Sequence, residues 1–157
     1  MAYVKLAPGK YPDKSDVVNL AYYIADVNKC ENIISGGLNI ISAIKYNPEL
    51  VTDQFFAIQQ GERFERRVYH IIVNFDCGLD QPDLKLAYQV GQAVINMYPD
   101  YQSVFTVHED KQSPHLHIMI NNCPVYPDKP KLTGIFNLPT VRQVVDEIID
   151  HHVMGGY

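Results

Sequence analysis

The chain has 157 residues, of which 46% are hydrophobic and 20% charged, so residues 1–157 can bury the core of one domain and little more. No run of 18 or more apolar residues occurs, and Met1 to Lys10 lack an apolar core, so we expect neither a membrane span nor a signal peptide. Thirteen Lys and Arg against 18 Asp and Glu give a net charge of −5, so any binding of nucleic acid should depend on a local patch or a metal ion.

The three cysteines, Cys30, Cys77 and Cys123, are odd in number, widely spaced and include no CxxC pair. This usage predicts reduced thiols in a cytoplasmic protein and argues against a cysteine zinc site. We expect the three thiols to be structural.

The first third of the chain is predicted to hold two helices. Ser15 is the predicted N-cap of a helix over 16–28, in which apolar residues recur at helical spacing: Val17, Leu20, Ala21 and Ile24. Gly36-Gly37 is interpreted as a break in the chain, with a short apolar segment around it. Asn47-Pro48, a cap followed by proline in the first turn, predicts a second helix that runs to about Gln60.

The rest of the chain is predicted to hold three strands and two helices. Arg67–Phe75 is rich in β-branched and aromatic residues and predicts a strand, and 83–97 predicts a helix. Val104–His108 and His115–Asn121 indicate the two strands of a hairpin, and Leu138–His152 indicates a closing helix. Strands and helices in mixed order, with a hairpin near the end, predict an α+β fold: an antiparallel sheet flanked by helices on both faces.

Three of the six histidines lie within ten residues, in the predicted hairpin. Side chains of a strand alternate between faces, so His115 and His117 project to the same side. The hairpin places His108 roughly opposite His115, and three neutral imidazoles are then close enough to share a divalent cation. The alternative is half-buried histidines that bond to their neighbours; His108 and Asp110 at hairpin spacing favour the metal site.

A His-only metal site leaves coordination positions open for phosphate oxygens or water, and phosphodiester transfer also needs a nucleophile. Tyr22 and Tyr23, on one turn of the first predicted helix, are candidates. At about 100° per residue, Tyr22 points away from the apolar stripe and Tyr23 lies at its flank. The chain has 11 tyrosines, so packing is the alternative explanation for either residue.

The histidine segment resembles the third motif of the relaxase (mobilisation nuclease) family, within the HUH endonuclease superfamily and particularly the MobP type of conjugative elements. That motif reads roughly HxDxxxxHxH followed by an apolar run and Asn. The matching residues are His108, Asp110, His115, His117 and Asn121. The family's element order is matched from about Ser15 to Met154.

Two further motifs of the family have counterparts here. Its first motif is a tyrosine in a short N-terminal helix, followed by Ile and, some residues on, Lys; Tyr23-Ile24 and Lys29 resemble it, which favours Tyr23 over Tyr22. Its second motif is a His-containing strand that ends in Ser-Phe, which Tyr69–Phe75 resembles with Asn74 in place of the serine.

The resemblance implies an enzyme that nicks DNA. His108, His115 and His117 would hold Mg²⁺ or Mn²⁺ against the scissile phosphate. The Tyr23 phenol would attack that phosphate and leave a 5′-phosphotyrosine and a free 3′-OH. Asp110 would orient a ligand histidine or take the phenolic proton. Reversal of the step would reseal the strand, which suits nicking a transfer origin and recircularising the product.

Five other residues are candidates for DNA binding. Arg63, Arg66 and Arg67 form the only tight basic cluster and are candidate phosphate contacts, the alternative being a solvated approach to the strand. The amides of Asn74 and Asn121 are the other candidates, Asn74 for the backbone 3′ of the nick.

We expect packing or supporting roles for the remaining histidines. His70 is interpreted as a packed histidine, or as one that supports a ligand, and not as a ligand itself. His151 and His152 are expected to interact favourably with the C-terminus of the last helix.

Other functions would use parts of the same pattern. A rolling-circle replication initiator or a single-strand transposase usually has its tyrosine after the HxH strand, where only Tyr126 and Tyr157 stand. A non-catalytic relaxase-like DNA-binding module has its best support in the acidic charge and in Asn74, but the intact set of ligand histidines weighs against it. A His-metal oxygenase of the double-stranded β-helix type needs many short consecutive strands, and the predicted helices argue against it.

The predicted partners are single-stranded DNA at a transfer origin and, because of the acidic charge, an accessory DNA-binding protein. The sequence leaves open the oligomeric state, the sequence of the nick site, the metal used in the cell and whether further domains follow.

Overall fold

The computed structural model describes residues 3–26, 35–44, 47–61, 63–75, 84–109 and 114–153. Within these ranges, five strands form one antiparallel sheet in the order β1-β3-β5-β4-β2. The strands are β1 (Tyr3–Leu6), β2 (Ser35–Leu38), β3 (Val68–Asn74), β4 (Tyr101–His108) and β5 (His115–Pro124).

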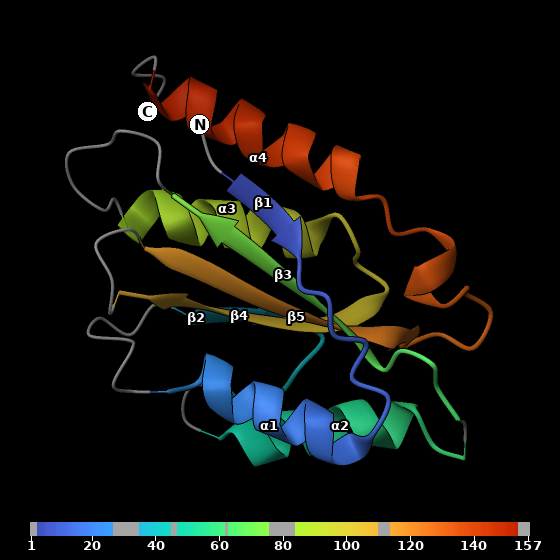
Figure 1. The fold of residues 1–157 in the computed structure, drawn as a ribbon. Helices are drawn as coiled ribbons and strands as arrows, with labels where there is room; N and C mark the ends of the chain where they lie inside the picture. The colour runs from blue at the N-terminus through green and yellow to red at the C-terminus, as the bar shows by residue number, and fades with distance from the viewer. Residues whose placement is uncertain are drawn as a thin grey trace.

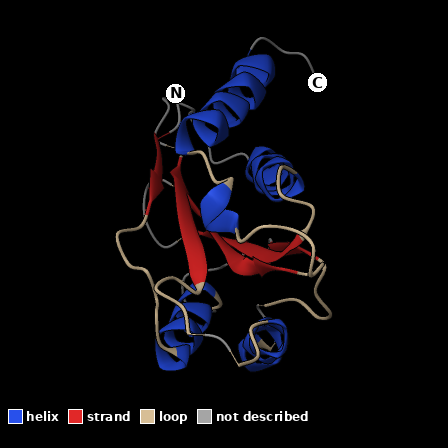
Figure 2. Cartoon of the chain, turned by 90° about the vertical axis from the view of Figure 1, so that its right-hand side faces the viewer, coloured by secondary structure: helices blue, strands red, loops and turns tan. Residues whose placement is uncertain are grey.

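Helices cover both faces of this sheet. α1 (Lys14–Ile24) and α2 (Pro48–Ile58) lie on one face, and α3 (Leu84–Asn96) and α4 (Leu138–Val153) lie on the other (Figure 1). A short 3₁₀ turn, η1 (Leu132–Gly134), packs beside β5. The view turned by 90° shows the sheet between the two pairs of helices (Figure 2). The predicted α+β fold, with helices on both faces of an antiparallel sheet, is confirmed.

The alternation of side chains along the strands divides the apolar residues between two cores. The larger core lies between the sheet and α3 and α4, and includes Ile71, Phe105, Ile118 and Val145. The smaller core joins α1 and α2 to the opposite face through Ile24, Phe55, Val104 and Met119. Each fully buried apolar side chain contributes about 1.5–3 kcal/mol, so these cores hold the helices on the sheet.

The predicted elements of the last two thirds of the chain are confirmed with small changes of bounds. β4 begins at Tyr101 and β5 ends at Pro124, so both strands of the hairpin are longer than predicted. α2 begins as predicted, because Asn47 Oδ1 accepts the backbone N–H of Leu50 at 3.0 Å and Pro48 fills the first position.

Among the described helices, none combines the length and the apolar character needed to cross a membrane.

α1 differs from the prediction at both ends. Its N-cap is Asp13 and not Ser15, because Asp16, three residues on, accepts the backbone N–H of Asp13 at 3.3 Å. Asp followed by Asp at this spacing can form the reciprocal bonds of a capping box, which starts the helix earlier. α1 ends at Ile24, whereas the prediction extended it to 28, since groups on β4 bond the Ile24 carbonyl.

Two strands were not predicted, and both lie at edges of the sheet. β1 pairs with β3, and β2, which contains Gly36-Gly37, pairs with β4. The interpretation of the two glycines as a break is wrong. A Cβ on Gly36 would lie 2.5 Å from ring carbons of Phe105, and a Cβ on Gly91 of α3 would lie 2.7 Å from the same ring. Gly36 and Gly91 therefore make room for the buried ring of Phe105.

Replacing Gly91 by Ala tests this close packing. Alanine favours a helix over glycine by about 1 kcal/mol, but overpacking a core costs about 1–3 kcal/mol. We expect the unfolding free energy to fall by roughly 1 kcal/mol, because the Phe105 ring has to shift. The measurement is the midpoint of urea unfolding, with Gln92→Ala on the same helix as the control. A Gly91→Ala protein as stable as the parent would contradict the packing described.

Candidate active site

The end of α1 is held against β4 by two hydrogen bonds to one carbonyl. The carbonyl of Ile24 is among the last four of the helix, which have no partner within it. Thr106 Oγ1 and His108 Nε2 each donate to this oxygen at 2.8 Å, and all three residues are buried. The contact fixes the last turn of α1, and Tyr23 with it, over the end of β4.

Tyr23 lies against two of the predicted ligand histidines. Its ring centroid is 5.4 Å from that of His108 and 5.4 Å from that of His117, and both contacts are edge-on. The side chain is 43% exposed and lines a cleft of about 570 Å³ together with Tyr11, Asn19 and His70. The phenol is therefore accessible from solvent while its ring is held beside two imidazoles.

The three predicted ligand histidines lie on one face of the sheet, the face that α1 covers. His108 and His115 are cross-strand partners in the β4–β5 register, and His117 follows two residues on. The ring centroids of His108 and His117 are 4.2 Å apart, and those of His115 and His117 are 6.4 Å apart. The structure thus brings the three imidazoles together. The predicted Asp110 lies outside the described residues.

The donor types suit a divalent metal ion, since neutral imidazole is a common protein ligand of such ions. As the side chains stand, no three His, Cys, Asp or Glu residues of the described ranges form a ready metal-binding group. His108 Nε2 bonds the Ile24 carbonyl, and His117 Nδ1 lies 2.9 Å from His70 Nε2. A ligand histidine ordinarily bonds a neighbour through its other nitrogen, so His108 would offer Nδ1 and His117 would offer Nε2.

A buried histidine, His70, stands behind His117. Its Nε2 faces His117 Nδ1 at 2.9 Å, and its Nδ1 lies 3.0 Å from Tyr11 Oη. Burial, together with the neighbouring His108 and Lys5, lowers the pKa of His70 to about 4. The ring is therefore neutral near pH 7, so that one of its nitrogens donates a hydrogen bond and the other accepts one.

The direction of this chain of hydrogen bonds decides what His117 can do. If His117 Nδ1 accepts from His70, the proton of neutral His117 sits on Nε2, which then cannot bind a metal. If His117 Nδ1–H donates to His70 Nε2, then His70 Nδ1–H donates to Tyr11 Oη, and His117 Nε2 carries a lone pair. Only the second direction is compatible with metal ligation by a neutral His117.

Tyr22, the alternative nucleophile, reaches α2 instead of the histidines. Its Oη donates to Glu49 Oε1 at 2.7 Å, and this hydrogen bond raises the pKa of the Tyr22 phenol. A phenol with a raised pKa is a poorer source of phenolate. The geometry therefore favours Tyr23 over Tyr22, in agreement with the motif.

Asn121 takes a role different from the expected DNA contact. Its side chain is fully buried, and Nδ2 donates to Gln102 Oε1 at 2.9 Å and to the Phe55 carbonyl at 3.3 Å. Its Oδ1 accepts from Gln59 Nε2 at 2.7 Å and from the Cys123 amide at 3.0 Å. These four bonds fill the capacity of an amide. The expectation that Asn121 binds DNA is therefore corrected: it ties α2 to the sheet.

The three arginines of the basic cluster do not meet at the histidines. Arg66 Nη1 donates to the Gly9 carbonyl at 3.2 Å, and Arg67 Nε donates to the Pro12 carbonyl at 2.7 Å. Both residues precede β3 and hold the segment that links β1 to α1. Arg63 is exposed. Whether any of the three touches DNA stays a prediction.

Asn74 lies beside the histidine cluster. It is the last residue of β3 and the register partner of His115, and it is half-buried. By contrast, His151 and His152 lie in the last turn of α4, on the opposite face of the sheet. Their interaction with the helix terminus stays a prediction.

Sequence reasoning missed two residues of the site. Thr106 precedes His108 by two residues on the same face of β4, so the alternation that identified the HxH pair could also have identified it. Tyr11 lies in a loop with a φ of 53°, and no pattern in the sequence places it beside His70.

Asn121→Ala tests the structural role of this amide. Removing it takes a buried hydrogen-bond partner from Gln102, from the Cys123 amide, from Gln59 and from the Phe55 carbonyl, although the last two keep others. We therefore expect a loss of roughly 3 kcal/mol in unfolding free energy. Urea unfolding measures the loss, and Asn96→Ala, at an exposed position of α3, is the matched control. If Asn121→Ala were as stable as the parent but bound DNA more weakly, Asn121 would be a DNA contact after all.

A family model described as relaxase, MobA/VirD2-like, nuclease domain matches residues 23–152, which is more than half of the chain. The matched span contains Tyr23 and the three clustered histidines. Among curated proteins, no significant match was found. The chain therefore belongs to the relaxase family, as a MobA/VirD2-like nuclease domain.

Proposed function

We propose that this chain is a relaxase that cuts one strand of DNA at a specific site, with Tyr23 as the nucleophile, to mobilise a plasmid or conjugative element from its transfer origin. The observation that carries the proposal is the contact of the Tyr23 ring with His108 and His117, at 5.4 Å from each. It joins a solvent-accessible phenol to two proposed metal ligands, in a chain of the relaxase family.

The proposed reaction is a transesterification. Tyr23 Oη attacks the scissile phosphorus, and the bond from phosphorus to the 3′ oxygen breaks as the bond to tyrosine forms. The phenolic proton passes to a base, for which Asp110 is the proposed residue, and the leaving 3′ oxygen takes up a proton. One phosphodiester is exchanged for another, so the 3′-OH can later attack the phosphotyrosine and reseal the strand.

His108, His115 and His117 are the proposed ligands of Mg²⁺ or Mn²⁺, which would polarise the phosphate and stabilise charge on its oxygens. His70 and Tyr11 support this role, because they can hold His117 in the tautomer whose Nε2 carries a lone pair. Asn74, the register partner of His115, is proposed to bond the DNA backbone 3′ of the nick.

Single-stranded DNA at the transfer origin is the proposed substrate. The net charge of −5 supports a further element of the proposal, an accessory DNA-binding protein that brings the chain to its site. The absence of CxxC pairs from the sequence supports a reducing, cytoplasmic location.

Two other functions are less well supported. A rolling-circle initiator or transposase would usually have its catalytic tyrosine after β5. Tyr126 follows the end of β5 that lies away from His115 and His117, and Tyr157 lies outside the described residues. A docking module without activity would have no use for a phenol held against the histidines. It becomes the better account only if the experiments below fail.

The nucleophile is tested by formation of a covalent adduct. Supercoiled DNA from the chain's own genetic neighbourhood is incubated with the protein and Mn²⁺, and adducts are resolved by denaturing electrophoresis. We expect an adduct from the parent and from Tyr22→Phe and none from Tyr23→Phe, because only Tyr23 lies against the histidines. EDTA should abolish the adduct.

Each other outcome revises the proposal in a different way. Loss of the adduct only in Tyr22→Phe would keep the reaction and change the nucleophile. No adduct from any variant, together with no Mn²⁺ bound in a titration, would overturn the catalytic proposal in favour of the docking module.

The support of His117 by His70 is tested by metal affinity. His70→Leu keeps a similar volume but removes the acceptor for His117 Nδ1–H, so we expect Mn²⁺ affinity to fall about 10–100-fold. Isothermal titration measures the affinity, and His151→Leu on α4 controls for the loss of an imidazole. Unfolding midpoints show whether His70→Leu remains folded. Equal affinities for folded His70→Leu and the parent would contradict the supporting role.

A further inference from the structure

A second cleft, of about 400 Å³, opens where the chain enters β3. Its wall comes from the link between β1 and α1, from the approach to β3 and β3 itself, from the end of β5, and from Lys131 and η1. The residues that carry the argument are Lys10, Phe64, Arg66, Tyr69, Lys131 and Thr133. The volume lies within the range of roughly 300–1,000 Å³ common for ligand sites.

The cleft is positively charged although the chain is acidic. Lys10, Arg66 and Lys131 contribute three positive charges and Glu65 one negative charge, which leaves +2 in a protein of net charge −5. Such a local excess attracts phosphate groups, which bind lysine and arginine side chains whatever the base sequence.

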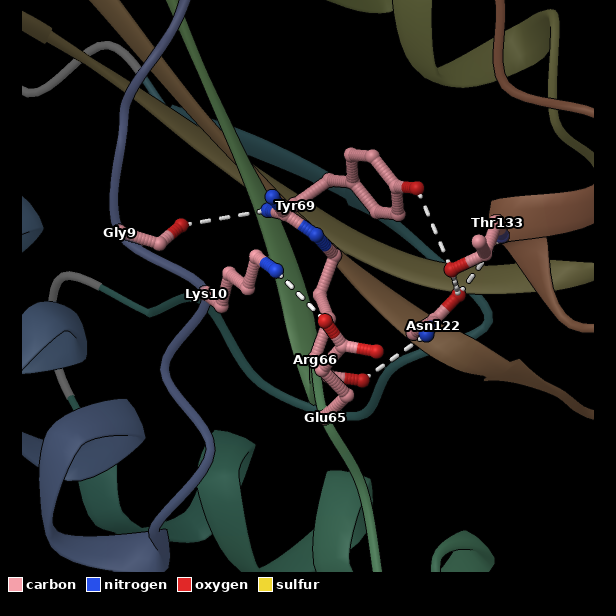
Figure 3. Close-up of polar contacts among 7 residues, drawn as sticks. All are labelled: Gly9, Lys10, Glu65, Arg66, Tyr69, Asn122 and Thr133. Carbon is pink, nitrogen blue, oxygen red and sulfur yellow. Dashed lines mark hydrogen bonds and ion pairs between the residues drawn. The ribbon is translucent and has the colours of Figure 1, made fainter.

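The floor of the cleft is held by a network of hydrogen bonds (Figure 3). Tyr69 Oη donates to Thr133 Oγ1 at 3.2 Å, and Thr133 Oγ1 donates to Asn122 Oδ1 at 3.1 Å. Asn122 Nδ2 in turn donates to the backbone carbonyl of Arg66 at 2.8 Å. Tyr69 and Asn122 are buried, so the network fixes the backbone at Arg66 relative to β5 and η1.

Two cations of the cleft lie over aromatic rings. The Arg66 guanidinium carbon is 4.4 Å from the centroid of the Tyr69 ring, and Lys131 Nζ is 4.6 Å from that of Phe64. Arg66 is also tied to the Gly9 carbonyl, as Figure 3 shows. A guanidinium fixed in this way offers a planar surface on which a nucleic-acid base can stack, besides its charge.

The cleft lies next to the cleft of Tyr23. Lys10 lines both of them, with Tyr11, Tyr23 and His70 on one side and Arg66 and Lys131 on the other. The Tyr69 ring lies in the core that α3 and α4 cover, whereas His70 and Tyr23 lie on the face of α1, so the two clefts are on opposite sides of β3. A strand that passes Tyr23 can therefore reach the second cleft by passing around the edge of the sheet at Lys10.

We propose that this second cleft binds a nucleotide of the single-stranded DNA substrate, away from the bond that is cut. Lys10 and Lys131 contact its phosphate, and Arg66 stacks on its base. The proposal rests on the proposed function for the identity of the strand. It extends the predicted role of Arg66 to two lysines that sequence reasoning did not select.

Glu65 competes with the DNA for one of these lysines. Lys10 Nζ and Glu65 Oε1 are 2.6 Å apart, and their side chains are 53% and 82% exposed. An ion pair this exposed is weak, so a phosphate can replace the carboxylate. Removal of the Glu65 charge should therefore strengthen binding of DNA, whereas removal of either lysine charge should weaken it.

The test measures binding without cleavage. A fluorescent oligothymidylate is titrated with the whole chain in EDTA, and anisotropy gives the affinity at several salt concentrations. We expect Lys10→Gln and Lys131→Gln each to lower affinity by up to about tenfold. Each should also reduce the slope of log affinity against log salt concentration by about 1, the loss of one phosphate contact. Glu65→Gln should raise affinity, and Lys85→Gln, at an exposed position of α3 outside the cleft, should leave it near that of the parent.

The outcomes separate the cleft from the proposed function. If Lys85→Gln weakens binding as much as the cleft variants do, the effect is one of net charge and the cleft proposal is overturned. If the parent forms the Tyr23 adduct but the cleft variants bind like the parent, the cleft proposal fails and the nicking function stands. If the parent neither binds the oligothymidylate nor forms an adduct, both fail.

Discussion

A helix ends with carbonyl groups that need donors from outside the helix, and in this chain the Ile24 carbonyl obtains two of them from β4. Each such bond contributes about 1 kcal/mol, and leaving the buried carbonyl without donors would cost roughly 1–3 kcal/mol. Because His108 is one of the donors, the imidazole that helps to build the histidine cluster also sets where the helix stops. The tyrosine one residue before that stop is thereby placed against the cluster.

The histidine cluster is supported by a series of hydrogen bonds that runs through His70 to Tyr11. The chain from His117 through His70 to Tyr11 is made of groups that can each donate or accept, so its direction is not fixed by geometry alone. Burial keeps His70 neutral, which prevents both ends of its ring from donating at once. A proton added or removed at His117 or at Tyr11 therefore changes the direction of every hydrogen bond between these two residues.

Periodicity and cap chemistry predicted most of the framework, since they depend on neighbouring residues in the sequence. The HxH strand, the hairpin to His108 and the start of α2 at Asn47 were of this kind. Features that depend on contacts between distant segments were missed. Gly36 belongs to a strand because Phe105 fills the space of the absent side chain. Three of the four hydrogen bonds of Asn121 join it to Phe55, Gln59 and Gln102. None of these partners is near Gly36 or Asn121 in the sequence.

The lysine shared by the two clefts has a thermodynamic consequence. A short DNA fragment bound beside Tyr23 attracts the Lys10 side chain and so removes the positive charge of Lys10 from the cleft of Arg66. A fragment bound in the cleft of Arg66 likewise removes this charge from the cleft of Tyr23. Such linkage is reciprocal, so two separate fragments oppose each other's binding by the same factor. One continuous strand meets Lys10 only once, at the crossing between the clefts. If both clefts bind DNA as proposed, Lys10 therefore favours one continuous strand over two separate fragments.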